Sequence, residues 1–141
     1  MASLVYNSFK KKIMDGSIDL DTDTIKIALV TSSYTPSADN DDFWDDVVAN
    51  EVGASGTYSA GGATLTVSLS QDNTDDEGVF DATDVSWTTA TITARYAVIY
   101  KSTGVSTTSP LICCIDFGSN QTSSGGTFAI TFAAEGILNL N

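Results

Sequence analysis

The sequence predicts a mainly β fold, either an antiparallel β-sandwich of jelly-roll-like type or a squashed barrel, with one or two short helices. Residues 91–101 form the longest run of β-branched and aromatic residues without Gly or Pro, which is typical of a strand. Residues 63–70 alternate between apolar and hydroxyl side chains, which predicts a strand with one buried face. Because the chain has 141 residues, 42% of them hydrophobic, we expect a single β domain spanning residues 1–141.

Residues 91–101 are expected to form the central strand. Ile92 and Tyr96 lie on one face at a period of two. The opposite face begins with Thr93 and becomes apolar toward Ile99. Apolar residues on both faces indicate a strand that is covered on both sides.

The N-terminal segment, at about residues 5–15, is predicted to be a short helix. Tyr6, Phe9 and Ile13 share one face, and Gly16 stands where a C-terminal cap is expected. A helix of this length is unstable alone, so it must dock on the sheet or on a neighbouring molecule.

A second short helix is predicted at residues 41–48, where Asp41 in the first turn suits the helix dipole. Phe43 and Trp44 belong to its apolar face. They form either part of a lid over an open sheet edge or an exposed aromatic contact for a partner.

The other strands are separated by polar turns. In residues 63–70 we expect Leu65, Val67 and Leu69 to point inward. The remaining predicted strands are residues 25–30, 79–81, 85–87, 111–117, 127–132 and 136–141.

Residues 19–24 begin like a calcium-binding loop, but the pattern fails. The sixth position is Thr24 instead of Gly, and the twelfth is Val30 instead of Glu. We therefore expect a surface turn, and we predict no cofactor.

The composition argues against several classes of function. The net charge is −12, which disfavours direct binding to nucleic acid because phosphate groups attract clustered Lys and Arg. The chain has no His, and no motif places a nucleophile beside a base, so we predict that it is not an enzyme. Cys113 and Cys114 are adjacent and point to opposite faces of a strand, so we expect two buried thiols.

The sequence contains no apolar run long enough to span a membrane, and we expect no membrane association. Residues 1–7 lack the basic and apolar segments of a signal peptide, so we expect synthesis in the cytoplasm.

Several stretches of the chain resemble a known group of proteins. The similarity lies in residues 6–10 and 16–26, in residues 92–101, and in residues 111–112 and 115–118. In these stretches the chain is similar to small structural proteins of tailed bacteriophages.

Within that group, the resemblance implies a capsid cement (decoration) protein that stabilises the head shell at contacts between major capsid subunits. Such a protein is a virion component on the capsid exterior, its partners are the major capsid protein and itself, and it is expected to form a homotrimer. The alternative is a tail- or fibre-associated virion protein that binds a host surface or carbohydrate. The resemblance carries over no catalytic residue.

The N-terminal segment is the predicted contact to the capsid or another partner. It joins two aromatic residues, Tyr6 and Phe9, to the only basic cluster, Lys10, Lys11 and Lys12. The competing interpretation is that Tyr6 and Phe9 close one end of the sandwich.

Overall fold

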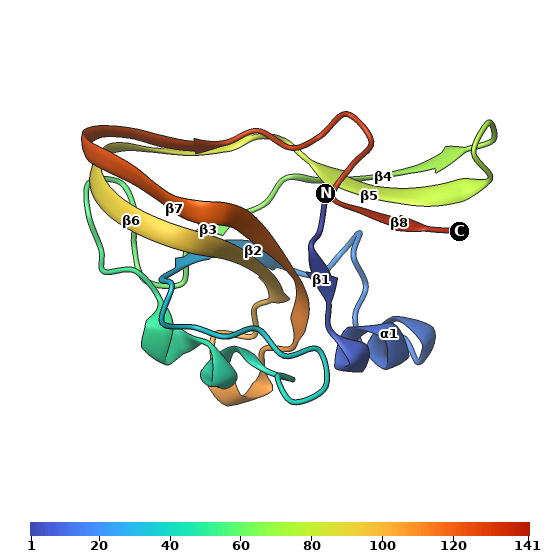
Figure 1. Cartoon of the computed structure of the whole chain (residues 1–141). Coiled ribbons are helices and arrows are strands. Elements are labelled where there is room, and N and C mark those ends of the chain that lie inside the picture. The colour runs from blue at the N-terminus through green and yellow to red at the C-terminus, as the bar shows by residue number, and fades with distance from the viewer.

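The computed structural model describes the whole chain, residues 1–141, as two antiparallel sheets and one α-helix (Figure 1). The five-stranded sheet has the order β1-β7-β6-β2-β3, with β1 at Leu4–Val5, β2 at Ile25–Val30, β3 at Ala63–Thr64, β6 at Val85–Lys101 and β7 at Leu111–Ile130. The three-stranded sheet has the order β4-β5-β8, with β4 at Val67–Asp72, β5 at Glu77–Ala82 and β8 at Leu138–Leu140. The predicted class is confirmed: the fold is mainly β, every strand pair is antiparallel, and the two sheets are consistent with a β-sandwich.

The centre of the larger sheet is β6, as predicted, because it pairs with β7 on one side and β2 on the other. Ala97, Val98 and Ile99 have no exposed surface, so this part of β6 is covered on both faces. One cluster of 34 buried side chains includes residues of both sheets.

β6 and β7 are longer than predicted, with 17 and 20 residues. Residues 85–87 join the central strand because an irregularity between Trp87 and Ala90, with Thr89 at φ 53°, shifts the register without ending the pairing. In β7, Gly118 at φ 83° bends the strand in the same way, since glycine adopts this conformation without steric cost. The result is one long, curved hairpin in place of four short strands (Figure 1).

The predicted strand at residues 63–70 is divided between the two sheets. β3 pairs with β2, and β4 then pairs with β5 in the smaller sheet. Leu65 is buried, but Leu69 is 48% exposed, so the expectation that Leu69 points into the core is wrong. The cause is that the hairpin of β4 and β5 extends away from the larger sheet (Figure 1).

The N-terminal helix forms as predicted, as α1 at Asn7–Met14. The second helix does not form: Trp44–Asp46 and Val48–Asn50 are separate 3-10 turns, η1 and η2. The backbone at the start of these turns bonds to the segment at residues 109–111 instead of forming a helix. Trp44 N–H donates to the Ser109 carbonyl at 2.8 Å, and Leu111 N–H donates to the Asp42 carbonyl at 3.0 Å.

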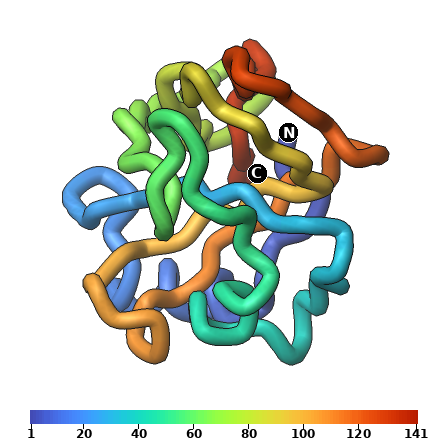
Figure 2. Tube along the Cα trace, turned by 90° about the vertical axis from the view of Figure 1, so that its left-hand side faces the viewer, coloured from blue at the N-terminus to red at the C-terminus, as the bar shows by residue number.

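The long connection of residues 31–62 runs across one side of the larger sheet (Figure 2). There Thr57 N–H donates to the Thr88 carbonyl at 3.1 Å, and Thr91 N–H donates to Ser55 Oγ at 2.9 Å. These bonds attach the connection to the outer part of β6.

Candidate interaction surface

The aromatic residues of the predicted N-terminal contact belong to the core. Tyr6 has no exposed surface and Phe9 is 3% exposed, so neither is available to a partner. The strand β1 before them pairs with β7, and Tyr6 N–H donates to the Ile112 carbonyl at 3.2 Å. The expectation of an aromatic contact at Tyr6 and Phe9 is therefore wrong, and the competing interpretation, that they close one end of the fold, describes their positions.

Tyr6 also joins α1 to the long connection through a chain of hydrogen bonds. Its hydroxyl lies 2.9 Å from the Tyr34 hydroxyl, which donates to Asp41 Oδ2 at 2.7 Å. The same carboxylate oxygen accepts from Ser37 N–H at 2.8 Å. Burial raises the pKa of both tyrosines, so both hydroxyls stay protonated and able to donate.

The three lysines of α1 differ in their surroundings. Lys10 and Lys11 are exposed, and Lys10 Nζ donates to Asn7 Oδ1 at 2.9 Å. Lys12 is half-buried, with its ammonium 4.7 Å from the centre of the Phe43 ring. Only Lys10 and Lys11 therefore present their charge to a partner.

Trp44 is not an exposed aromatic contact. It is 5% exposed and stacks on Tyr100. Phe43 is half-buried under Lys12. Backbone hydrogen bonds attach the segment that contains both residues to residues 109–111, which follow β6. This attachment favours the interpretation of the segment as a lid over the sheet edge.

A hollow of about 390 Å³ lies beside the stacked rings of Trp44 and Tyr100. Lys26 and Glu51 contribute its charged groups. Glu51 Oε1 accepts from the Tyr58 hydroxyl at 2.8 Å, and burial, followed by the charge of Glu51, raises the pKa of Tyr100 to about 12. The hollow thus combines an aromatic pair with fixed polar groups.

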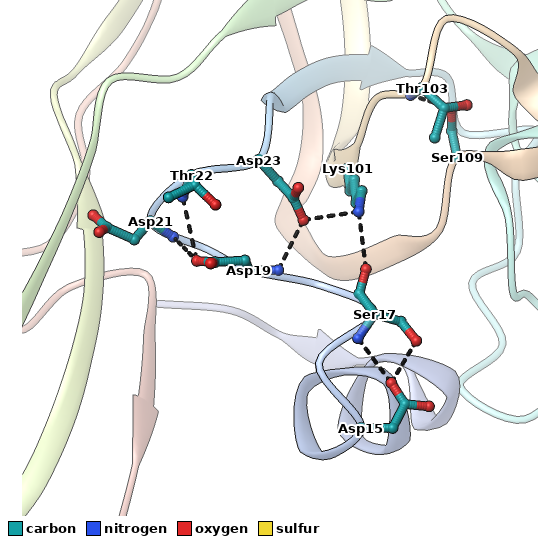
Figure 3. A network of polar contacts seen from close by, with 9 residues as sticks. All are labelled: Asp15, Ser17, Asp19, Asp21, Thr22, Asp23, Lys101, Thr103 and Ser109. Atoms are coloured by element: carbon teal, nitrogen blue, oxygen red, sulfur yellow. Dashed lines mark hydrogen bonds and ion pairs between the residues drawn. The ribbon is translucent and has the colours of Figure 1, made fainter.

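Residues 19–24 form the predicted surface turn (Figure 3). Asp19 Oδ1 accepts from Asp21 N–H at 3.0 Å, and Asp23 Oδ2 accepts from Asp19 N–H at 2.8 Å. The ammonium of Lys101 lies 2.9 Å from Asp23 Oδ2 and donates to the Ser17 carbonyl at 2.9 Å. Lys101, at the end of β6, therefore neutralises the carboxylate of Asp23.

The two thiols are buried, as predicted: Cys113 has no exposed surface and Cys114 has 1%. Burial raises the pKa of Cys113, and it raises that of Cys114 to about 12. The reactive thiolate form is therefore scarce near neutral pH.

The most apolar hollow lies between α1, the turn after it and the smaller sheet, and we call it the apolar cleft. Its volume is about 250 Å³. Its apolar walls consist of Ile13, Leu20, Leu69, Val79, Phe80, Leu138 and Leu140.

The smaller sheet supplies most of the apolar cleft from one face. The register places Leu69 opposite Phe80 and Phe80 opposite Leu138, so the three side chains lie side by side. Leu140 is 68% exposed and Met14, at the end of α1, is 81% exposed. A continuous apolar surface of this kind is typical of a protein contact.

The turn between β4 and β5 and the opposite face of the smaller sheet are acidic. Around two shallow hollows there lie Asp72, Asp75, Asp76, Glu77, Asp81 and Glu135. Asp72 Oδ1 accepts from Thr74 N–H at 2.7 Å, and hydrogen bonds from Thr74 and Asp75 lower the pKa of Asp72. We call residues 72–77 the acidic turn.

Sequence reasoning missed the apolar cleft although it identified its strands. The alternation in residues 63–70 predicts inward leucines, and the apolar tail at residues 136–141 predicts a last strand, but neither pattern predicts an exposed apolar face. The sequence predicts several strands with one apolar face but few elements that could cover those faces. This imbalance could have indicated that one apolar face stays exposed.

The only α-helix, α1, has eight residues, and no helix in the structure is long and apolar enough to cross a membrane. No group of three or more Cys, Asp or Glu side chains is arranged to hold a metal ion. No protein-family model, no curated protein and no solved structure matches the chain.

Proposed function

We propose that this chain is a structural protein of a bacteriophage virion, most specifically a capsid cement protein on the exterior of the head. It stabilises the shell at contacts between major capsid subunits, and it acts as a homotrimer without enzymatic activity. The support from the residues is the similarity of residues 6–10, 16–26, 92–101, 111–112 and 115–118 to such proteins.

The observation that carries a role in assembly is the apolar cleft. Two of its lining leucines are exposed, Leu69 at 48% and Leu140 at 68%, whereas 34 buried apolar side chains form one cluster. A cement protein acts by burying surface between neighbouring subunits, and it needs contact surfaces instead of a catalytic site.

The basic residues that support a partner contact are Lys10 and Lys11. Their ammonium groups are exposed on α1, on a protein whose net charge is −12. They remain available to an acidic surface of the major capsid protein or to a neighbouring copy of this chain.

Electron cryo-microscopy of the virion that contains this protein tests the proposal directly. We expect density for the fold on the outer surface of the head, as trimers at local threefold positions between major capsid subunits. Density found only on the tail or its fibres would overturn the proposal.

A tail- or fibre-associated protein that binds host carbohydrate is the second candidate, and the hollow beside Trp44 and Tyr100 favours it. Sugars bind where aromatic rings adjoin hydrogen-bonding groups, and Lys26 and Glu51 supply such groups here. The low exposure of Trp44, 5%, weakens this candidate because little of its ring can meet a sugar. Calorimetric titration with isolated host polysaccharide, with Lys26→Ala as the variant, separates the two candidates: binding that the variant loses favours the second.

A further inference from the structure

The apolar cleft has the wrong lining for a small-molecule site. Sites for small ligands place a few polar groups that fix the orientation of the ligand. Here Ser70 and Gly78 are the only lining residues that are not hydrophobic. The cleft therefore offers apolar contact area, which suits the surface of another protein.

One strand of the cleft is also an unpaired sheet edge. In the order β4-β5-β8, β8 lies at the end of the smaller sheet, and it carries Leu138 and Leu140 into the cleft. Exposed edges with apolar side chains invite association, and native proteins cover them. An occupant of the cleft covers this edge and the leucines together.

The charges around the cleft have opposite signs on its two walls. Lys10 and Lys11 lie one helical turn before Ile13 and Met14 on α1, so they border the helical wall. The other wall, formed by β4, β5 and β8, ends at the acidic turn. A partner with a single sign of charge is attracted by one wall and repelled by the other.

A second copy of this chain has the matching arrangement. Its acidic turn complements Lys10 and Lys11, and its own lysines complement the next acidic turn. The other four basic side chains are already engaged or partly covered: Lys12 lies over Phe43, Lys26 is half-buried beside the hollow at Tyr100, Lys101 pairs with Asp23, and Arg95 pairs with Asp116. The exposed lysines of α1 are thus the natural partners of an acidic turn from another copy.

We infer that the apolar cleft is the interface between copies of this chain, in which the β4–β5 hairpin of one copy docks on α1 and the cleft of the next. Each copy gives one hairpin and receives one, so the contact is head-to-tail, and we expect it to close as a ring, such as the proposed trimer. The inference rests on the proposed function only in taking the chain to assemble with itself.

Measurement of the molar mass in solution by light scattering and sedimentation tests the interface. We expect a closed oligomer for the wild type. The variants Leu69→Asp and Leu140→Asp place a charge in the interface, and each should weaken self-association by about tenfold or more. Leu69 is 48% exposed and Leu140 is 68% exposed in the single chain, so the variants should fold, as far-UV spectra and melting curves will verify.

Val105→Asp is the matched control, because Val105 is also exposed, at 55%, but lies in the loop between β6 and β7, outside the cleft. It should leave the molar mass unchanged. Oligomers that persist in both leucine variants, or a wild type that stays monomeric at every concentration, overturn the inference.

A zero-length carbodiimide cross-link gives a second readout. In a mixture of isotope-labelled and unlabelled chains, we expect links of mixed labelling between Lys10 or Lys11 and the carboxylates of the acidic turn. Links found only within one chain overturn the inference.

Failure of the inference can be told from failure of the proposed function. A protein that forms rings through the cleft but does not decorate phage heads contradicts the function alone. A protein that decorates heads with both leucine variants at full occupancy contradicts the interface alone.

Discussion

The indole of Trp44 lies nearly parallel to the phenol ring of Tyr100, with ring centroids 4.5 Å apart and 5° between the planes. The two residues are 5% and 3% exposed. Since Trp44 belongs to η1 and Tyr100 to β6, this stack attaches the long connection to the central strand.

Trp44→Ala should therefore be strongly destabilising, by about 3–5 kcal/mol, because it removes the stack and leaves a cavity. Val48→Ala is the control: Val48 lies in the next turn but is 38% exposed, and its loss should cost about 0.5 kcal/mol or less. Urea unfolding followed by tryptophan fluorescence measures both, from Trp87 alone in Trp44→Ala and from Trp44 and Trp87 in Val48→Ala. Equal stability of the two variants would show that the stack contributes little.

Two glycines with similar backbone angles should respond differently to alanine. Gly62 has φ +77°, and a Cβ there would lie 1.8 Å from the Ile27 carbonyl oxygen. Gly104 has φ +85° but nothing within 4 Å of the same position. Gly104→Ala should cost about 1 kcal/mol from backbone strain, whereas Gly62→Ala adds a clash with β2 and should cost more than about 2 kcal/mol. Thermal melting of the two variants compares them, and the reverse order would contradict the close approach of residue 62 to β2.

The strands could be predicted because their signal is local. A period of two in apolar side chains identifies residues 25–30 and 91–101 from the chain alone. The joining of residues 85–87 to the central strand depends on Thr89 at positive φ, which no local pattern indicates. The 3-10 turns at Trp44–Asp46 and Val48–Asn50 likewise depend on bonds to the loop near Ser109, distant in sequence.

The apolar cleft could not be predicted from the sequence, because it also depends on contacts between distant parts of the chain. Alternation shows which side chains share a face of a strand, but it does not show whether another element covers that face. The alternation therefore predicts that Leu69 points inward, and only the arrangement of the smaller sheet reveals Leu69 and Leu140 as exposed. For Tyr6 and Phe9 the error was the opposite, because the pairing of β1 with β7 that buries them spans most of the sequence.

The ion pair of Arg95 and Asp116 gives a prediction about pH. Arg95 Nε lies 2.6 Å from Asp116 Oδ1, and hydrogen bonds from Arg95 and then from Gly118 N–H lower the pKa of Asp116. A lowered pKa in the folded state means that the stabilisation is present above the unfolded value, about 3.9, and is lost as the pH falls through the folded value.

Asp116→Asn should accordingly be slightly less stable than the wild type at pH 7, and the difference should shrink as the pH falls below about 4. The pair is exposed, so a small difference is expected. Urea midpoints across this pH range measure it. A difference that grows toward low pH would contradict the lowered pKa.

The thiols should be unreactive in the native protein. Cys113 and Cys114 are buried, with pKa values raised by that burial, so a thiol reagent meets neither an accessible sulfur nor a thiolate. Iodoacetamide at pH 8 should label neither in the folded chain and both after denaturation, as counted by mass spectrometry. Rapid native labelling would show that the strand β7 opens readily.

Charge reversal on α1 tests the partner contact at the level of the virion. Lys10→Glu with Lys11→Glu should leave the fold intact, because both side chains are exposed, while lowering the occupancy of the protein on phage heads. Higher salt should weaken the binding of the wild type, since the contact is electrostatic at an exposed surface. Lys12 is left unchanged because its ammonium lies over Phe43, and its loss would disturb the fold as well as the charge.

The neutral double variant, Lys10→Gln with Lys11→Gln, is the control for this experiment. It keeps the length of both side chains without their charge, so its occupancy should fall between those of the wild type and the reversed variant. This order is expected whether the lysines meet the shell directly or the acidic turn of the next copy, because either contact is needed for decoration. If the charge-reversed protein occupies phage heads fully, Lys10 and Lys11 do not take part in the contact.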